Sequence, residues 1–212
     1  MSTTSNDHAV VGHLRGAPSS GVEASFDIVA IASSAGGLAA LTSTLSALPA
    51  DFPAAVLVVQ HLDPRHRSLM AEILSRRTAL AVVQAVGGEP IEAGTVYVAP
   101  PDHHLLANAN RTLELAQTEL VHFVRPSADL LFESVAAAYR ERSIAVVLTG
   151  SGSDGAMGVE AVKKMGGTVL AQDESTSEFF SMPSAAIATG KVDFVLPLEE
   201  MAPALLSLVV GG

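Results

Sequence analysis

FDIVAIASSAGG, residues Phe26–Gly37, is the stretch that decides the fold. Its first half is apolar and rich in β-branched residues, which predicts a buried strand over Phe26–Ile31. Its second half holds only Ala, Ser and Gly, which are small enough for a tight turn, and a helical pattern follows over Gly37–Leu45. A strand, a tight turn and a helix in direct succession are typical of the units that build a parallel α/β sheet.

The same alternation continues toward the C-terminus and predicts a doubly wound, mostly parallel sheet in a Rossmann-like three-layer sandwich. Apolar runs with few charges, as expected for strands covered on both faces, predict further strands over Ala54–Gln60, Leu80–Val86, Ser143–Thr149, Thr168–Gln172 and Val192–Leu196. Helical patterns are predicted over Ser68–Arg77, Ser127–Arg140, Gly155–Met165, Pro183–Thr189 and Glu199–Val209.

The middle of the chain breaks this rhythm. Thr95–Ala99 and Thr112–Gln117 are short β-rich runs, and Asn108-Ala109-Asn110 lies between them. Asn-rich turns between β-rich runs favour a hairpin, so we expect a β-hairpin inserted into the α/β pattern here.

Composition bounds the class of protein. The chain has 212 residues, 49% of them hydrophobic, which supports one folded domain over residues 26–212 preceded by a flexible tail over residues 1–25. It has no cysteine, which excludes disulfides, thiolate nucleophiles and Cys-ligated zinc. No signal peptide or bilayer-spanning apolar run is visible, so we expect a cytoplasmic protein without membrane insertion. The net charge of −10 disfavours nucleic acid as a partner.

Chemically useful side chains follow three of the predicted strands, at the point where each strand ends. Ser34 follows the first strand, His61 follows the second, and Asp154 lies in TGSGSDG, Thr149–Gly155. Ligand sites in doubly wound sheets lie beyond the carboxyl ends of the strands, so we expect these three residues to converge. A hydroxyl, an imidazole and a carboxylate in contact are the groups of a serine hydrolase.

Each of these residues also has a simpler interpretation. Ser34 lies in a segment close to the G-x-S-x-G nucleophile elbow, with Ala32 at the first glycine, but serines also commonly cap helices. His61 could be a structural histidine bound to a backbone carbonyl. Asp154 could hold the imidazole of His61 in its catalytic tautomer, or simply form an Asp-Gly turn.

A metal site would need other histidines near His61. The conceivable partners are His66, His103 and His104. However, the spacing of His61 and His66 does not put both on one helix face, and adjacent histidines normally point apart. We therefore expect no metal.

A dinucleotide site is the sharper alternative. Gly150, Gly152 and Gly155 fit G-x-G-x-x-G between a strand and a helix, and Asp173 closes the next strand at about the right distance. Asp154 would, however, place a negative charge at the helix N-terminus, where the pyrophosphate must bind. A dinucleotide-binding, oxidoreductase-like domain therefore stays as the alternative function.

These segments, in this order, resemble the catalytic domain of the chemotaxis protein-glutamate methylesterases, the CheB family. Ile31–Gly37 is similar to the family's Ile-Gly-Ala-Ser-Thr-Gly-Gly segment, Gln60-His61 to its Gln-His segment, and Thr149–Gly155 to its Thr-Gly-x-Gly-x-Asp-Gly segment. Further matches are Val98-Ala99-Pro100, Arg125-Pro126-Ser127-Ala128-Asp129, Ala171-Gln172-Asp173-Glu174 and Met182-Pro183-Ser184-Ala185-Ala186-Ile187. The resemblance runs from Phe26 to the end of the chain.

The resemblance implies a serine esterase that hydrolyses glutamate γ-methyl esters, with glutamine deamidation as a second activity. It implies Ser34 as the nucleophile, His61 as the general base, Asp154 as its orienting partner and the backbone N–H of Ser151 as an oxyanion donor. It implies no metal and no organic cofactor. The implied partner is a methylated chemoreceptor or a similar signalling protein.

The sequence departs from the family pattern in two ways. Ala32, Ser33 and Ala35 replace the family's Gly, Ala and Thr, all with small residues. The family usually carries an N-terminal receiver domain, and the stretch before Phe26 is too short for one, so we expect a stand-alone catalytic domain that is constitutive or controlled by a separate regulatory partner. A non-catalytic binding module on the same scaffold is the remaining alternative, although such a module has no need of the three site residues together.

Overall fold

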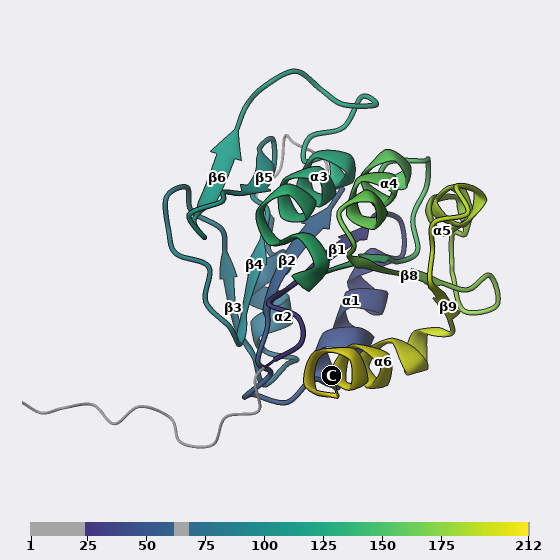
Figure 1. Ribbon diagram of the computed structural model, residues 1–212, viewed down its shortest axis with the longest axis horizontal. Helices are drawn as coiled ribbons and strands as arrows, with labels where there is room; N and C mark the ends of the chain where they lie inside the picture. The colour runs from purple at the N-terminus through teal and green to yellow at the C-terminus, as the bar shows by residue number, and fades with distance from the viewer. Residues whose placement is uncertain (1–23, 62–67, 212) are drawn as a thin grey trace, which may run out of the picture.

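A seven-stranded parallel sheet lies at the centre of the computed structural model, which describes residues 24–61 and 68–211 (Figure 1). The strand order is β3-β4-β2-β1-β7-β8-β9, and every neighbouring pair is parallel. The strands are β1 (Ile28–Ser33), β2 (Ala55–Gln60), β3 (Ala81–Gln84), β4 (Thr95–Val98), β7 (Ser143–Val147), β8 (Thr168–Gln172) and β9 (Phe194–Leu196). Residues 1–23, most of the expected N-terminal tail, lie outside the described residues.

Helices cover both faces of the sheet and complete three layers (Figure 1). One face carries α3 (Ala128–Tyr139), α4 (Ala156–Lys164) and α5 (Ser181–Ala188), and the other carries α1 (Gly37–Ser46), α2 (Met70–Ser75) and α6 (Leu198–Val210). A one-turn 3-10 helix, Arg140–Arg142, follows α3.

Alternate residues of β1 supply the two cores. Ile28, Ala30 and Ala32 pack toward the α3 face, whereas Val29 and Ile31 pack toward the α1 face. All six residues of β1 are buried, because the strand lies in the middle of a sheet that is covered on both sides. This explains why the deciding stretch of sequence is apolar without alternation.

The structure confirms the predicted doubly wound parallel sheet but corrects its middle section. The β-rich run at Thr95–Val98 is not an arm of a hairpin; it is β4, paired in parallel with β2 and β3. The hairpin is formed instead by β5 (His104–Ala107) and β6 (Leu113–Ala116), which pair antiparallel around the predicted Asn-rich turn. A short β-rich run has the same local pattern in either arrangement, so only its partner distinguishes them.

The strand order reverses at β1, since β2 lies on one side of it and β7 on the other. In sheets of this type the crevice beyond the carboxyl ends of the strands at such a reversal is the usual ligand site. Ser34, His61 and the segment that contains Asp154 follow β1, β2 and β7, so all three start at this edge. No helix within the described ranges is both long and apolar enough to cross a membrane.

Candidate active site

The turn after β1 places two adjacent serines in different environments. Ser33 ends the strand and is buried, and its hydroxyl donates to Gln60 Oε1 at 2.6 Å. Ser34 is partly exposed, and its backbone N–H donates to Thr149 O at 3.1 Å. Gly36 completes the turn with a φ of 76°, a left-handed conformation that favours glycine. Of the two hydroxyls, only that of Ser34 is accessible at this edge.

Gly150, from the segment after β7, lies directly against the Ser34 side chain. A Cβ at Gly150 would lie 2.9 Å from Ser34 Cβ and would also clash with Met182 Sδ. The first glycine of TGSGSDG is therefore required by a close approach between two segments rather than by its φ. This contact fixes the turn that carries Ser34 against the segment that carries Asp154.

A hydrogen bond joins the residues that follow β2 and β7. His61 Nε2 lies 2.8 Å from Asp154 Oδ2, although the two residues are 93 apart in sequence. The His61 side chain is 12% exposed and that of Asp154 is 4% exposed. Since a carboxylate accepts the Nε2 proton, the lone pair of the imidazole is on Nδ1.

Ser34 and His61 occupy equivalent positions at the ends of adjacent strands. Ser33 pairs with Gln60 in the parallel register, so the next residue on each strand lies about 5 Å from its counterpart. Ser34 Oγ makes no hydrogen bond with any residue in the part of the chain that the structure describes. Of the three predicted residues, the structure therefore joins His61 to Asp154 but does not join Ser34 to His61. Contacts between a nucleophile and its base are often loose without substrate.

The carboxylate of Asp154 lies at the N-terminus of α3. Besides His61, it accepts hydrogen bonds from Ser127 Oγ at 2.9 Å, from Ala128 N at 2.6 Å and from Asp129 N at 3.1 Å. Burial opposes ionisation, but the hydrogen bonds from His61, Ala128 and Asp129 outweigh it, and the pKa of Asp154 lies below its usual value. Asp154 is therefore ionised at neutral pH, and its negative charge faces the imidazole of His61.

Gln60, which the sequence marks only as part of the Gln60-His61 motif, contacts both segments of the site. Its Nε2 donates to Ser34 O at 2.7 Å and to His61 O at 3.1 Å, while its Oε1 accepts from Ser33. One buried amide thus ties the turn that carries Ser34 to the segment that carries His61. The signal available in the sequence was a polar residue at the end of an otherwise apolar strand.

The predicted oxyanion donor lies between β7 and α4. Ser151 is exposed, and its backbone N–H has no acceptor among residues 24–61 and 68–211. The neighbouring Gly152 N donates to Ser181 Oγ at 3.3 Å, which anchors the segment to α5. The N–H of Ser151 is therefore available to a ligand.

The glycines of the dinucleotide alternative surround an N-terminus that is already occupied. The backbone N–H groups of Gly155 and Gly158, at the start of α4, donate to Asp129 Oδ1 at 2.9 and 2.7 Å. Asp173 is equally engaged, because its carboxylate accepts from Thr176 and Ser175 in its own turn. A pyrophosphate at α4 would have to displace a buried carboxylate.

The histidines considered as metal ligands make structural contacts. His104 is buried, accepts from Ser127 N at 3.1 Å through Nδ1 and bonds Glu119 O at 3.0 Å through Nε2. His103 Nδ1 lies 2.9 Å from Pro101 O. His66 lies outside the described residues.

A cavity of about 150 Å³ opens beside His61. Two apolar side chains at its border, Leu120 and Phe123, are 54% and 94% exposed. Arg125 and Asp102 also line the cavity and form an ion pair at 2.6 Å, so the wall of the cavity contains a neutral pair. The remaining residues of the lining are Val124 and Pro126.

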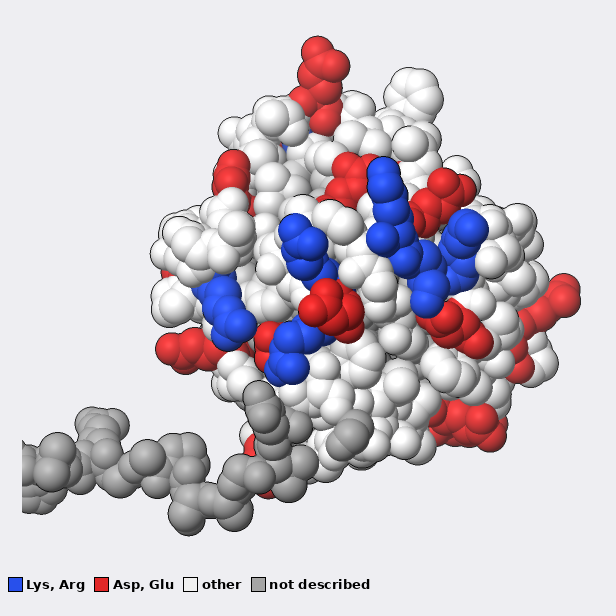
Figure 2. All heavy atoms as spheres, in the orientation of Figure 1, with Lys and Arg blue, Asp and Glu red and all other residues white. Residues whose placement is uncertain are grey.

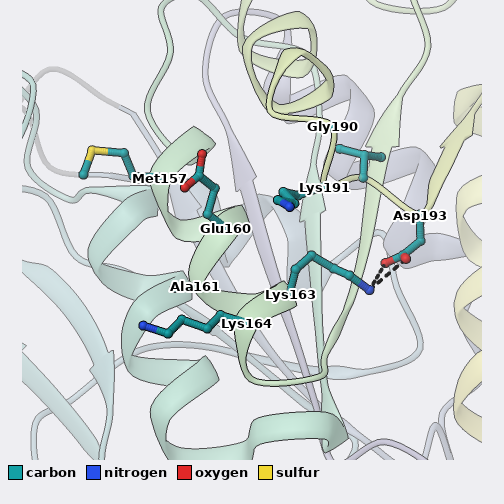
Figure 3. Close-up of a pocket in the computed structure, with 9 residues that line it drawn as sticks. Met157, Glu160, Ala161, Lys163, Lys164, Gly190, Lys191 and Asp193 are labelled. Atoms are coloured by element: carbon teal, nitrogen blue, oxygen red, sulfur yellow. Dashed lines mark hydrogen bonds and ion pairs between the residues drawn. The ribbon is translucent and has the colours of Figure 1, made fainter.

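A larger hollow of about 790 Å³ lies elsewhere, along α4 and the segment before β9 (Figure 3). All three lysines of the chain line it, and Lys163 forms an ion pair there with Asp193 at 2.8 Å. Figure 2 shows that Lys and Arg side chains on this side of the molecule are interspersed with acidic ones. No residue of the predicted site lines this hollow.

Comparison with known proteins identifies the family. Residues 29–205, which are most of the described chain, match the CheB methylesterase family. This chain belongs to the CheB methylesterase family. The catalytic domain of the CheB methylesterase from Thermotoga maritima has the same fold, with a TM-score of 0.84 and 39% identity over 87% of this chain and all of that domain.

Relatives in the CheB family carry a double name. A protein-glutamate methylesterase/protein-glutamine glutaminase of Moorella thermoacetica is 41% identical over 190 residues, covering 88% of this chain and 45% of its own length. A putative protein of the same name from Leptospira interrogans is 38% identical over 86% of this chain and 95% of its own length. The chain spans about half the length of several of these relatives, for example 56% of one from Caulobacter vibrioides.

Proposed function

We propose that this chain hydrolyses γ-methyl esters of protein glutamate side chains and releases methanol. The observation that carries the proposal is the bond between His61 Nε2 and Asp154 Oδ2, formed beside the partly exposed Ser34 at the edge of the sheet where ligands bind. The catalytic unit lies within residues 26–212. The names of the relatives support the reaction class.

Acylation begins when Ser34 Oγ attacks the carbonyl carbon of the ester and His61 Nδ1 takes the hydroxyl proton. The ionised Asp154 stabilises the resulting imidazolium through Nε2. The carbonyl oxygen becomes an oxyanion, and the free N–H of Ser151 is the proposed donor to it. When the tetrahedral intermediate collapses, His61 returns the proton to the methoxy oxygen and methanol leaves.

Deacylation repeats these steps with water. Water loses a proton to His61 and attacks the acyl carbon, the bond to Ser34 Oγ breaks, and Ser34 recovers its proton from His61. The products are methanol, a glutamate carboxylate and a proton. An amide reacts at the same centre with ammonia as the leaving group, so we propose glutamine deamidation as a second activity of the site.

The proposed substrate is a methylated chemoreceptor or a similar signalling protein. A methyl ester is uncharged, and the cavity beside His61 is lined by exposed apolar side chains and a neutral ion pair. These features fit an uncharged side chain presented by a protein surface.

The adjacent serines give the proposal a matched test. Ser34→Ala should lower kcat for methanol release from a methylated receptor fragment by about three orders of magnitude or more. Ser33→Ala, which removes a buried hydroxyl bonded to Gln60 but keeps the nucleophile, should lower kcat far less. A fluorophosphonate should label wild type and Ser33→Ala at Ser34.

Two results would overturn the proposal. Methanol release by a folded Ser34→Ala protein at the wild-type rate would remove Ser34 from the reaction. Absence of both methanol release and a Ser34 adduct in the wild type would favour a binding module that keeps the scaffold without the chemistry.

A further inference from the structure

Two aspartates near the N-termini of α3 and α4 each accept hydrogen bonds from the backbone of the neighbouring helix. Asp154 precedes α4, but its carboxylate accepts from the N–H groups of Ala128 and Asp129 at the start of α3. Asp129 belongs to the first turn of α3, but its Oδ1 accepts from the N–H groups of Gly155 and Gly158 at the start of α4. Asp154 therefore caps α3, the helix that contains Asp129, and Asp129 caps α4, the helix that follows Asp154.

The two helices lie side by side in contact at this end (Figure 1). A Cβ at Gly158 would lie 2.6 Å from Phe132 Cβ and 3.0 Å from Asp129 Cα, so the α4 backbone packs directly on α3. Gly155 has a φ of 101° and is itself buried between the helices. The position of the Asp154 carboxylate thus depends on how closely the N-termini of α3 and α4 approach each other. The Asp129 side chain links these two N-termini.

We propose that Asp129 is a positioning residue of the active site, which holds the Asp154 carboxylate at His61 by capping α4 while its own backbone N–H binds Asp154 Oδ1. This inference rests on the proposed function for its catalytic readout only. The geometry requires two acceptor contacts from the Asp129 side chain and one donor contact from its main chain, all within the same turn.

The capping of α4 requires an acceptor oxygen from Asp129 but not a negative charge. Burial and the nearby negative charge of Asp154 raise the pKa of Asp129, against the hydrogen bonds from Gly158 and Gly155. Its second oxygen, Oδ2, has no hydrogen-bond partner among the described residues, although His122 Nε2 lies 3.3 Å away. A neutral side chain with one carbonyl oxygen should therefore replace it.

Substitutions at Asp129 distinguish a residue that positions Asp154 from one that only stabilises the fold. Asp129→Ala should lower kcat for methanol release by about 10²-fold with KM unchanged, because the carboxylate that orients the base shifts. Asp129→Asn should restore most of that loss, since the amide oxygen accepts from Gly155 and Gly158. The control is Ser134→Ala in the same helix, which loses a bond from Ala107 N to Ser134 Oγ away from Asp154.

A spectroscopic readout keeps the test independent of the substrate. The proton on His61 Nε2 should give a downfield NMR signal because of its bond to Asp154. This signal should move or broaden in Asp129→Ala, and it should be retained in Asp129→Asn and in Ser134→Ala even if thermal stability falls.

The proposal is overturned if Asp129→Ala keeps both the wild-type kcat and the wild-type signal, or if it loses kcat no more than Ser134→Ala does at equal loss of Tm. It is also overturned if Asp129→Asn behaves like Asp129→Ala. If the wild type releases no methanol, the proposed function fails, and the signal and the fluorophosphonate labelling rate of Ser34 still decide the role of Asp129. If Asp129→Ala does not fold, the comparison of Asp129→Asn with wild type decides it.

Discussion

The acid side and the nucleophile side of the site are held in opposite ways. The Asp154 side chain is buried and bonded to His61 and to three groups at the start of α3. The Ser34 side chain is partly exposed, and its hydroxyl bonds to nothing in the described part of the chain. Only the backbone of Ser34 is fixed, by Thr149 O and by the amide of Gln60.

This contrast shows which parts of the site are prepared before substrate arrives. A carboxylate that only orients and compensates charge can be fixed permanently, because it does not move during the reaction. A nucleophile must approach its base and then the substrate carbon, so its oxygen needs a free torsion. Replacing the Asp154 carboxylate should therefore affect stability and activity together, whereas removing the Ser34 hydroxyl should affect mainly activity.

The largest loss of activity that tests this difference between the two sides is expected at Asp154. Asp154→Asn should lower kcat by about 10³- to 10⁴-fold, because the amide stabilises neither the correct tautomer nor the positive charge of His61. It should also lower the free energy of unfolding, since an amide NH₂ group meets backbone N–H donors at the start of α3. Methanol release and urea unfolding measure the two effects. A loss of activity without any loss of stability would contradict the view that Asp154 also holds α3.

A smaller effect is expected on the nucleophile side. Gly150→Ala should lower kcat by about 10²-fold, because the new Cβ meets Ser34 Cβ and displaces the turn. Crowding against Met182 should cost about 1–3 kcal/mol of stability. Gly87→Ala is the control, since its Cβ would meet only ordinary contacts with Leu115. Equal kinetics for the two variants would show that the turn has more slack than the structure indicates.

The smallest expected effects concern pH. The lowered pKa of Asp154 contributes stability above its unfolded-state value of 3.8, and that contribution is lost as the pH falls through the lower folded-state value. The raised pKa of Asp129 acts in the opposite direction: its contribution is complete below 3.8 and is lost as the pH rises through the folded-state value. The charged or titratable groups facing this pair are His61 and His122.

Urea unfolding across this pH range therefore separates the two aspartates. Relative to wild type, Asp154→Asn should lose stability as the pH rises, whereas Asp129→Asn should gain it. Asp27→Asn, at the opposite edge of the sheet, breaks the ion pair with Arg142 and should cost about 0.5–1 kcal/mol at neutral pH without changing kcat. Parallel pH profiles for the two site variants would contradict the opposite shifts.

The sequence predicted most of the fold because each central strand is a short apolar run that ends in a polar residue. It misplaced Thr95–Val98, whose β-rich pattern is the same in a parallel sheet and in a hairpin. It also extended α2 beyond Met70–Ser75 at both ends. These errors arise where a local pattern is shared by two arrangements and only the tertiary partner decides between them.

The position of the three predicted residues at one edge of the sheet was predictable for a different reason. Ser34, His61 and Asp154 follow strands whose ends must meet, so topology brings them together. The roles of Gln60 and Asp129 were not predictable in this way. Gln60 acts through the backbone carbonyls of two strands, and Asp129 through the N-terminus of a helix almost thirty residues away in sequence. Such contacts exist only once the helices are packed.

The separation of 93 positions between His61 and Asp154 in the sequence has a consequence for biosynthesis. The nucleophile and base leave the ribosome well before the acid and before the helix that anchors it. A partly translated chain therefore has an imidazole without its carboxylate, and the proposed catalytic site is complete only when β7 and the segment after it have joined the sheet.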